Sequence, residues 1–290
     1  MQNPAAIRGR AAISAGDERT AERELRGAVE IEQQNWELWR DLARAQFRLA
    51  KHDTALLSIS RALSLAPQAA DAMLLRGQIH LARGSRASAL EDARHASSTL
   101  DRPSQLQECA ILLLRLHELD SAMATAQRAV LLSGHDPDAY TNWAVLAAEA
   151  GAQRRVESIF AEGRRRHPND APLAQAEAAW LVDRGEFTRA KAAYNALLHV
   201  HSRPGLVHLA LALLYHQEGA LNSAHNHAWL AVSLEGHARA DVHYTYIVIL
   251  RDRSQSRAAA KQLKQAKRRF PHDAGLQRLA ATAMLPDPPP

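Results

Sequence analysis

Small side chains recur along the chain at a nearly constant interval, with larger apolar side chains between them. One column consists of Ala21, Ala55, Ala89, Ala122, Val156, Ala190, Ala224 and Ala259, spaced by 34, 34, 33, 34, 34, 34 and 35 residues. A second column, seven residues later, consists of Ala28, Ala62, Ala96, Ala129, Gly163, Leu197, Ala231 and Ala266. Positions seven apart share one face of a helix, and small residues there let two backbones approach closely. The pattern predicts a tandem array of closely packed helices.

Two further columns divide each period into two helices. Twelve residues before the first column lie Gly9, Ala43, Gly77, Ala110, Ala144, Ala178, Ala212 and Ile247. Between these two columns lie Gly16, Ala50, Gly84, His117, Gly151, Gly185, Gly219 and Ser254. Five of these eight are glycine, which readily adopts the left-handed backbone that ends a helix. Proline then ends the second helix at Pro67, Pro168 and Pro271, so each period is predicted to be a helix–turn–helix unit.

Composition excludes several other classes. Aromatic residues make up 5% of the 290 residues, which suits alanine-rich helices better than a β-sandwich. A single cysteine, Cys109, excludes an intramolecular disulfide framework and a multi-cysteine zinc site. No apolar run is long enough for a transmembrane helix, and no signal peptide is visible after Met1. We therefore expect a cytoplasmic chain without a cofactor or a metal.

The columns resemble the tetratricopeptide repeat (TPR), a helix–turn–helix unit of about 34 residues. The second repeat is the clearest, because it holds Trp39, Leu42, Ala43, Ala55, Ala62 and Pro67. The resemblance implies an all-α, right-handed TPR superhelix (an α-solenoid) of antiparallel helix pairs in a single array over residues 2–285. Its repeats begin near residues 2, 36, 70, 103, 137, 171, 205 and 240. A capping helix is expected over 274–285, and a disordered proline-rich tail over 286–290.

The resemblance also implies that the first helix of each repeat lines a concave groove. The groove positions carried onto this sequence are Arg40, Arg44, Phe47, Arg48, Leu74, Gln78, Gln107, Ile111, Thr141, Val145, Leu209, Leu213, Tyr244 and Val248. Three arginines on one helix face repel one another unless an anion neutralises them. Exposed apolar side chains further along would mark a binding surface. We expect the groove to hold a partner segment that is acidic at one end. The alternative is a tight superhelix, or a self-dimer, that covers these residues.

A second candidate surface lies near the C-terminus, where Arg257, Lys261, Lys264 and Arg268 share one helix face. Residues 251–290 hold nine basic and three acidic residues, a net charge of +6, whereas the other 250 residues carry −1. The stripe is either a solvated face or a contact for an acidic protein, anionic lipid or nucleic acid. Nucleic acid is the weakest of these, because no aromatic residue is interleaved with the stripe.

Three other patterns have structural interpretations. Eight of the fifteen histidines lie between His199 and His243, but their spacing favours structural or solvated roles over a metal site. We expect Cys109 to be a buried small hydrophobe and not a nucleophile. We expect Asp136 to cap a helix that begins at Pro137.

The function predicted from these features is that of a non-enzymatic adaptor or scaffold, in which the groove holds a protein or peptide segment. The setting could be a bacterial secretion, pilus or polysaccharide assembly. The alternative is the N-terminal, substrate-recruiting region of a larger enzyme, such as a glycosyltransferase or a sulfotransferase. An acidic protein at the basic C-terminal end and self-association are further expected contacts.

Overall fold

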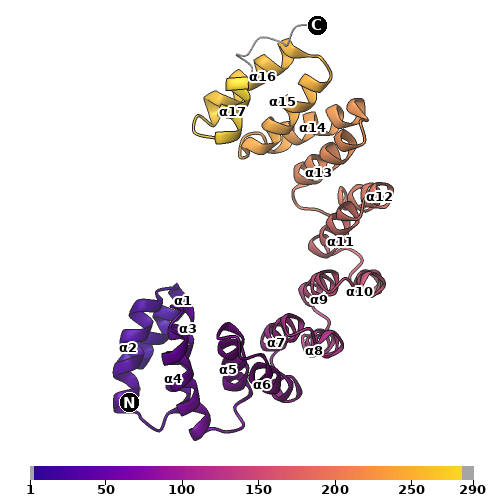
Figure 1. The fold of residues 1–290 in the computed structure, drawn as a ribbon. Coiled ribbons are helices and arrows are strands. Elements are labelled where there is room, and N and C mark those ends of the chain that lie inside the picture. Colours follow the sequence, from indigo (N-terminus) through magenta and orange to yellow (C-terminus); the bar gives the residue numbers. More distant parts are fainter. Residues whose placement is uncertain (1–2, 283–290) are drawn as a thin grey trace. The chain divides into compact units, whose positions relative to one another are not determined.

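The computed structural model describes residues 3–282, and the C-terminal tail 286–290, with the last residues of the expected capping helix, lies outside them. The described residues form helices and turns without a strand (Figure 1). In chain order the helices are α1 (Pro4–Ala15), α2 (Glu18–Ile31), α3 (Trp36–Arg48), α4 (His52–Leu65), α5 (Ala70–Ala82), α6 (Arg86–Thr99), α7 (Pro103–Arg115), α8 (Leu119–Leu132), α9 (Pro137–Glu149), α10 (Gln153–Arg166), α11 (Ala171–Asp183), α12 (Phe187–Leu197), α13 (Pro204–Gln217), α14 (Leu221–Glu235), α15 (Ala240–Asp252), α16 (Ser256–Arg269) and α17 (Ala274–Thr282).

The helices group into two compact units, Met1–Ile159 and Phe160–Pro290, with the boundary inside α10. In each unit the helices pack as consecutive pairs, for example α3 with α4 and α13 with α14. The odd-numbered helices also contact one another, from α1 to α9 in the first unit and from α13 to α17 in the second. We call the surface formed by these odd-numbered helices the first-helix face.

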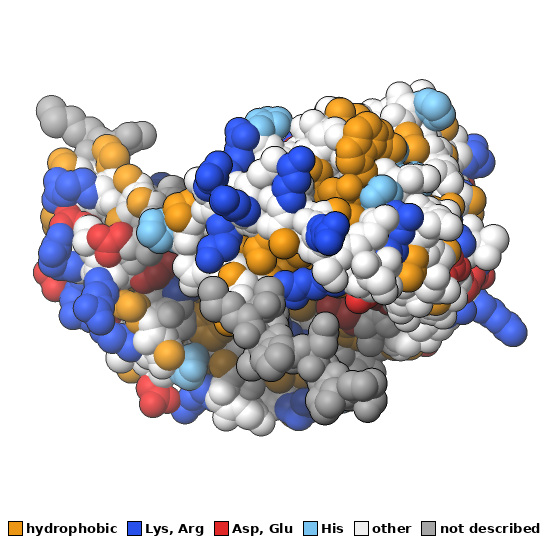
Figure 2. Space-filling model, turned by 90° about the horizontal axis from the view of Figure 1, so that it is seen from above, with side chains coloured by type: hydrophobic (Ala, Val, Ile, Leu, Met, Phe, Trp, Pro, Cys, Tyr) orange, Lys and Arg blue, Asp and Glu red, His pale blue; other side chains and the backbone are white. Residues whose placement is uncertain are grey.

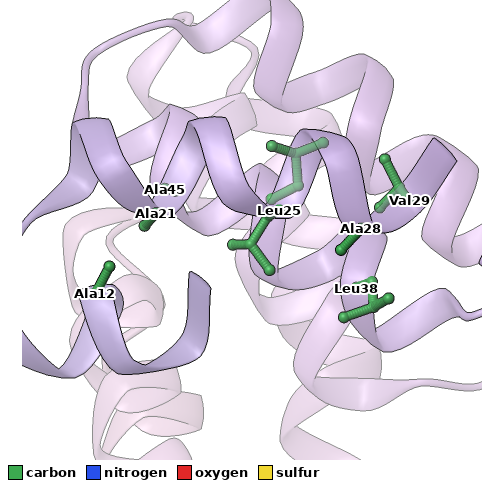
Figure 3. Packing of buried hydrophobic residues seen from close by; sticks show 8 residues of the cluster. Ala12, Ala21, Leu25, Ala28, Val29, Leu38 and Ala45 are labelled. Atoms are coloured by element: carbon green, nitrogen blue, oxygen red, sulfur yellow. The ribbon is translucent and has the colours of Figure 1, made fainter. Parts of the chain in front are cut away.

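The columns of small residues are the contact points between helices. All members of the first three columns are buried, including Ala21, Ala55 and Ala224. Figure 3 shows how Ala12 of α1, Ala21, Leu25 and Ala28 of α2, and Leu38 of α3 lie together in the first core cluster. At Gly9 the approach is so close that an added Cβ would lie 2.6 Å from Leu25 Cγ. A larger residue there would force α1 away from α2.

The turn column adopts the backbone conformation that its glycines suggest. All eight positions have positive φ angles, including Gly84 at 81° and the non-glycine residues Ala50 at 58° and Ser254 at 59°. Side chains with a Cβ pay a steric penalty in this region, whereas glycine does not. Position in the repeat therefore decides the turn, whichever residue occupies it.

The described chain contains no helix with the length and apolarity needed to span a bilayer. The second unit ends with α17, whose Leu276 and Leu279 are buried against Ile247 and Leu250 of α15 and Leu263 of α16. In this way α17 covers apolar side chains that the last helix pair would otherwise expose.

Candidate functional site

Two adjoining hollows lie on the first-helix face of the first unit, between α3, α5 and α7. The first has a volume of about 340 Å³ and is lined mostly by polar and basic residues: Arg44, Phe47, Arg48, Asp71, Leu74, Leu75, Gln78, Arg102, Ser104, Gln105 and Glu108. The second has a volume of about 260 Å³ and a more apolar lining: Phe47, Gln78, Leu81, Ala82, Glu108, Ile111, Leu112 and Arg115. Phe47, Gln78 and Glu108 line both, so the two hollows adjoin at these side chains, and together we call them the groove.

The three arginines of α3 have different environments. Arg40 is 16% exposed, and its guanidinium bonds Asp41 at 2.8 Å and Asp71 of α5 at 2.5 Å. It also lies 5.1 Å from the centre of the Trp36 ring. Burial alone would lower the pKa of Arg40, but the two carboxylates outweigh it, so the pKa is raised. The anions that we expected from a partner are thus supplied at Arg40 by the chain itself, and its guanidinium belongs to the packing of α3 on α5.

Arg48 and Arg44 remain closer to the solvent. Arg48 is exposed and pairs with Glu18 of α2 at 2.7 Å. Arg44 is half-buried, lines the first hollow, and has no carboxylate within ion-pair distance among residues 3–282. Arg102 also has no carboxylate within ion-pair distance among residues 3–282. It is exposed, immediately precedes α7 and lines the hollow from the other side. Two guanidiniums without a carboxylate partner in the described chain therefore line this hollow, together with one carboxylate, Glu108, that has no ion pair there either. Because the unpaired basic groups outnumber the unpaired acidic one, the hollow favours an anion.

Leu74 corrects the sequence-based picture of the groove. We expected its side chain to be solvated, but it is only 3% exposed and belongs to the floor of the first hollow. Gln78 and Phe47 are half-buried walls, and Ile111 of α7 is exposed at the edge of the second hollow. The apolar lining that a ligand would meet here therefore comes from Phe47, Leu81 and Ile111.

The other predicted groove residues of the first unit do not line these hollows. Gln107 of α7 is half-buried, while its neighbours Gln105 and Glu108 reach the groove. Thr141 of α9 donates a hydrogen bond to the Pro137 carbonyl at 3.3 Å, and Val145 is exposed on the same helix. The polar and charged lining residues that were not predicted from the sequence are Asp71, Arg102, Ser104, Gln105, Glu108 and Arg115.

On the second unit the predicted positions form a sparse apolar strip. Leu213 of α13 is 50% exposed and Leu209, one turn earlier, is half-buried. On α15, Tyr244 is exposed and Val248 is half-buried. A Cβ on Gly275 would lie 3.2 Å from the Tyr244 ring, so this ring also packs against the start of α17.

The basic stripe of α16 is exposed along its whole length, at Arg257, Lys261, Lys264 and Arg268. The opposite side of the helix is buried through Ala259, Leu263 and Ala266. Figure 2, which looks onto the C-terminal end of Figure 1, shows Lys and Arg side chains gathered on this face. Within the described chain none of the four stripe residues has an ion-pair partner.

Three histidines of the second unit, His208, His225 and His227, make contacts within the fold. His227 of α14 lies against His208 of α13, with 3.0 Å between their Nδ1 atoms, and stacks on Tyr215. His225, two residues earlier, turns the other way and bonds the Tyr246 hydroxyl at 3.2 Å. Burial lowers the pKa of both His208 and His227. No group of three or more metal-ligating side chains occurs among residues 3–282.

The structure confirms the expected burial of Cys109 and the expected helix cap at Asp136. Cys109 is buried, its thiol donates to the Ala93 carbonyl, and burial raises its pKa to about 12. The thiol is therefore protonated at neutral pH and is a poor nucleophile. Asp136 caps α9, because its carboxylate accepts a hydrogen bond from the Asp138 amide at 3.1 Å. Pro137 is the first residue of that helix.

Comparison with known proteins finds similarity in structure only. No protein-family model matches the sequence, and no curated protein matches it. The C-terminal part of a TPR repeat-containing protein from Cytophaga hutchinsonii matches 83% of this chain and 98% of its own, with 14% identity and a TM-score of 0.56. A structure of Naa15/Naa10 bound to HypK-THB matches 98% of this chain and 44% of the other, with 12% identity and a TM-score of 0.52.

Yeast Tom70 matches 92% of this chain and 58% of its own, with 16% identity and a TM-score of 0.50. Identities this low concern the fold alone. The tandem helix pairs and these solved structures agree on one fold, and the chain is an all-α solenoid with the tetratricopeptide-repeat fold.

Proposed function

We propose that this protein is an adaptor that holds a segment of another protein in the groove between α3, α5 and α7. The proposal rests on two adjoining hollows, of which one is lined mainly by polar and charged residues and the other is more apolar. Arg44 and Arg102 face one of them without a carboxylate partner in the described chain, and Phe47 and Ile111 lead into the other. A segment with an acidic side chain a few residues from a large apolar side chain would satisfy both ends.

The basic and the apolar ends of the groove would contribute different amounts to the binding free energy. Ion pairs at solvent-accessible arginines contribute about 0.2–1 kcal/mol each, so the half-buried Arg44 and the exposed Arg102 would mainly set the direction and register of the segment. Burying one large apolar side chain in the second hollow contributes about 1.5–3 kcal/mol. We therefore infer that the apolar anchor supplies most of the affinity. The secretion, pilus or polysaccharide assembly considered above stays a prediction.

The test is a selection from a random peptide library displayed on phage, with the purified protein as target. Enriched peptides should share an acidic residue close to an apolar one. A selected peptide, labelled and measured by fluorescence anisotropy, should bind the Arg44→Glu/Arg102→Glu variant about tenfold more weakly, and Ile111→Asp by at least as much.

The matched control is Arg19→Glu/Arg61→Glu, which reverses two exposed, unpaired arginines of the described chain on α2 and α4. This control has the same change in net charge and should bind like the unsubstituted protein. Equal loss of binding in both double variants, or full binding by Ile111→Asp, would contradict the proposed groove.

A further inference from the structure

The second helices of the last two pairs, α14 and α16, enclose a hollow that lies outside the first-helix face. Its volume is about 510 Å³, and its lining includes Val232, Ser233 and Gly236 on one side and Gln265, Arg268 and Arg269 on the other. The floor is fixed, because His243 bonds the Gly236 carbonyl at 2.9 Å and the Gln262 side chain at 2.7 Å. Arg269 donates to the His237 carbonyl at 3.0 Å and ties the ends of α14 and α16 together.

The α16 wall of this hollow is a part of the basic stripe. Of the stripe residues, Arg268 lines the hollow beside Gln265 and Arg269. Lys261 lies one turn before Gln265, and Lys264 lies one turn before Arg268, so both extend the basic surface from the edge of the hollow along α16. From Arg253 to His272 the sequence holds seven Lys or Arg and no acidic residue. At 1.5 Å per residue, the stripe from Arg257 to Arg268 is about 16 Å long, or three turns of a partner helix.

The absence of internal neutralisation distinguishes α16 from the other helix that ends in three basic residues. On α10, Arg164 pairs with Glu177 at 2.8 Å, and Arg165 and Arg166 both pair with Glu162. On α16 the corresponding helix end carries Lys267, Arg268 and Arg269, and no ion pair to any of them exists within residues 3–282. The chain thus neutralises the basic end of α10, whereas the basic end of α16 has no carboxylate partner among residues 3–282.

The α14 wall adds an apolar component. Trp229 lies three, four and seven residues before Val232, Ser233 and Gly236, so it shares their helix face one turn away from the hollow. Its side chain is 53% exposed, although it is a large apolar group. The sequence alone did not reveal an aromatic residue beside the basic stripe, because Trp229 belongs to the preceding repeat.

We propose that this hollow is a second docking surface, which binds an acidic amphipathic helix of another protein. Carboxylates at three- and four-residue spacing would meet Lys261, Lys264 and Arg268, and an apolar edge of the same helix would pack on Trp229 and Val232. This occupant matches both walls, because its carboxylates complement the basic α16 wall and its apolar edge complements the apolar residues of α14. The proposal does not depend on the groove of the first unit.

Two other anionic partners fit the surface less well. A bilayer would require an apolar face to insert, but the apolar side of α16 is buried in the fold through Leu263 and Ala266. A single-stranded nucleic acid would require several aromatic platforms for successive bases, and this surface offers one.

The experiment measures binding of a labelled amphipathic peptide, with Glu at three- and four-residue spacing and Leu on one edge, by fluorescence anisotropy at low and physiological salt. The expected result is salt-sensitive binding that weakens at least tenfold in Lys261→Glu/Lys264→Glu and about threefold or more in Trp229→Ala. These positions are exposed, and circular dichroism checks that each variant is folded. A peptide of the same composition with scrambled order should bind more weakly.

The matched control, Arg19→Glu/Arg61→Glu, has the same charge change on α2 and α4, outside both proposed binding surfaces, and should leave this binding unchanged. Three results would overturn the proposal. The two double variants could lose binding equally, the scrambled peptide could bind as well as the ordered one, or vesicles of phosphatidylserine and phosphatidylcholine or an oligothymidylate could bind more tightly than the peptide.

Discussion

Replacing Arg40 should destabilise the fold, whereas replacing Arg44, one turn later on α3, should leave its stability almost unchanged. Arg40→Met removes the ion pairs to Asp41 and Asp71 and the contact with the Trp36 ring. Hydrogen bonds to charged groups contribute about 1.5–3 kcal/mol each, and a fully orphaned buried charge costs about 3–5 kcal/mol. Asp41 keeps a second partner, because Arg10 bonds it at 2.8 Å. We therefore expect Arg40→Met to lower the free energy of unfolding by about 2 kcal/mol.

Arg44→Met is the matched comparison, because it removes the same charge from the same helix without breaking an ion pair of the described chain. Its free energy of unfolding should change by less than about 0.5 kcal/mol. Urea unfolding followed by circular dichroism gives both values, and amide hydrogen exchange in α3 and α5 should increase only in Arg40→Met. If the two variants unfold at the same urea concentration, Arg40 does not stabilise the packing of α3 on α5.

Two further predictions concern the turns and the histidine pair. Ala50→Gly should raise the free energy of unfolding by about 0.5–1 kcal/mol, because φ at Ala50 is 58°, and unchanged or reduced stability in urea would contradict this. Because the pKa values of His208 and His227 are lowered, the folded protein binds fewer protons than the unfolded chain. Their contribution is complete above the unfolded histidine pKa of about 6.5 and is lost as the pH falls through the lowered native values. The melting temperature should therefore be lower at pH 5.5 than at pH 7.5, and this decrease should be smaller in His227→Phe. If the decrease were the same in both proteins, the histidine pair would not be its cause.

The fold could be predicted because its determinants repeat within each unit of about 34 residues. Close packing requires small residues at fixed points, and Ala21, Ala55 and Ala224 are all buried there. The turn requires a positive φ at one position, and Ala50 and Ser254 adopt it without the glycine that would favour it. These constraints act over short distances in the sequence, so columns of residues were sufficient to reveal them.

The site could be predicted only in part, because its properties depend on pairs of residues from different repeats. Arg40 was a candidate ligand-binding residue because of its position within its helix. The charge of Arg40 is, however, neutralised by Asp71, 31 residues later. Arg10 and Asp41 have the same separation of 31 residues and form the same kind of bond between α1 and α3. An arginine followed by an aspartate at this spacing is a signal that could have identified internally paired arginines.

Other residues were missed for geometric reasons. Arg102 precedes its helix, so a rule based on helix positions does not include it, although it lines the first hollow. Leu74 was predicted to be exposed because its position points toward the groove, but the neighbouring first helices are close enough to cover it. Trp229 lies on a second helix, outside the positions that the family resemblance assigns to the groove.

The two proposed binding surfaces of this chain are distinguished by which charges remain unpaired in the described residues, and not by how many charges are present. Arg40 and Arg48 belong to a basic stripe, but Asp41, Asp71 and Glu18 neutralise them. At the mostly buried Arg40, the cost of removing the charge from water is therefore offset within the fold. Lys261, Lys264 and Arg44 have no such compensation in the described chain, so an incoming carboxylate would gain attraction there without displacing an internal partner. The same solenoid can thus hold one arginine for packing and its neighbour for recognition.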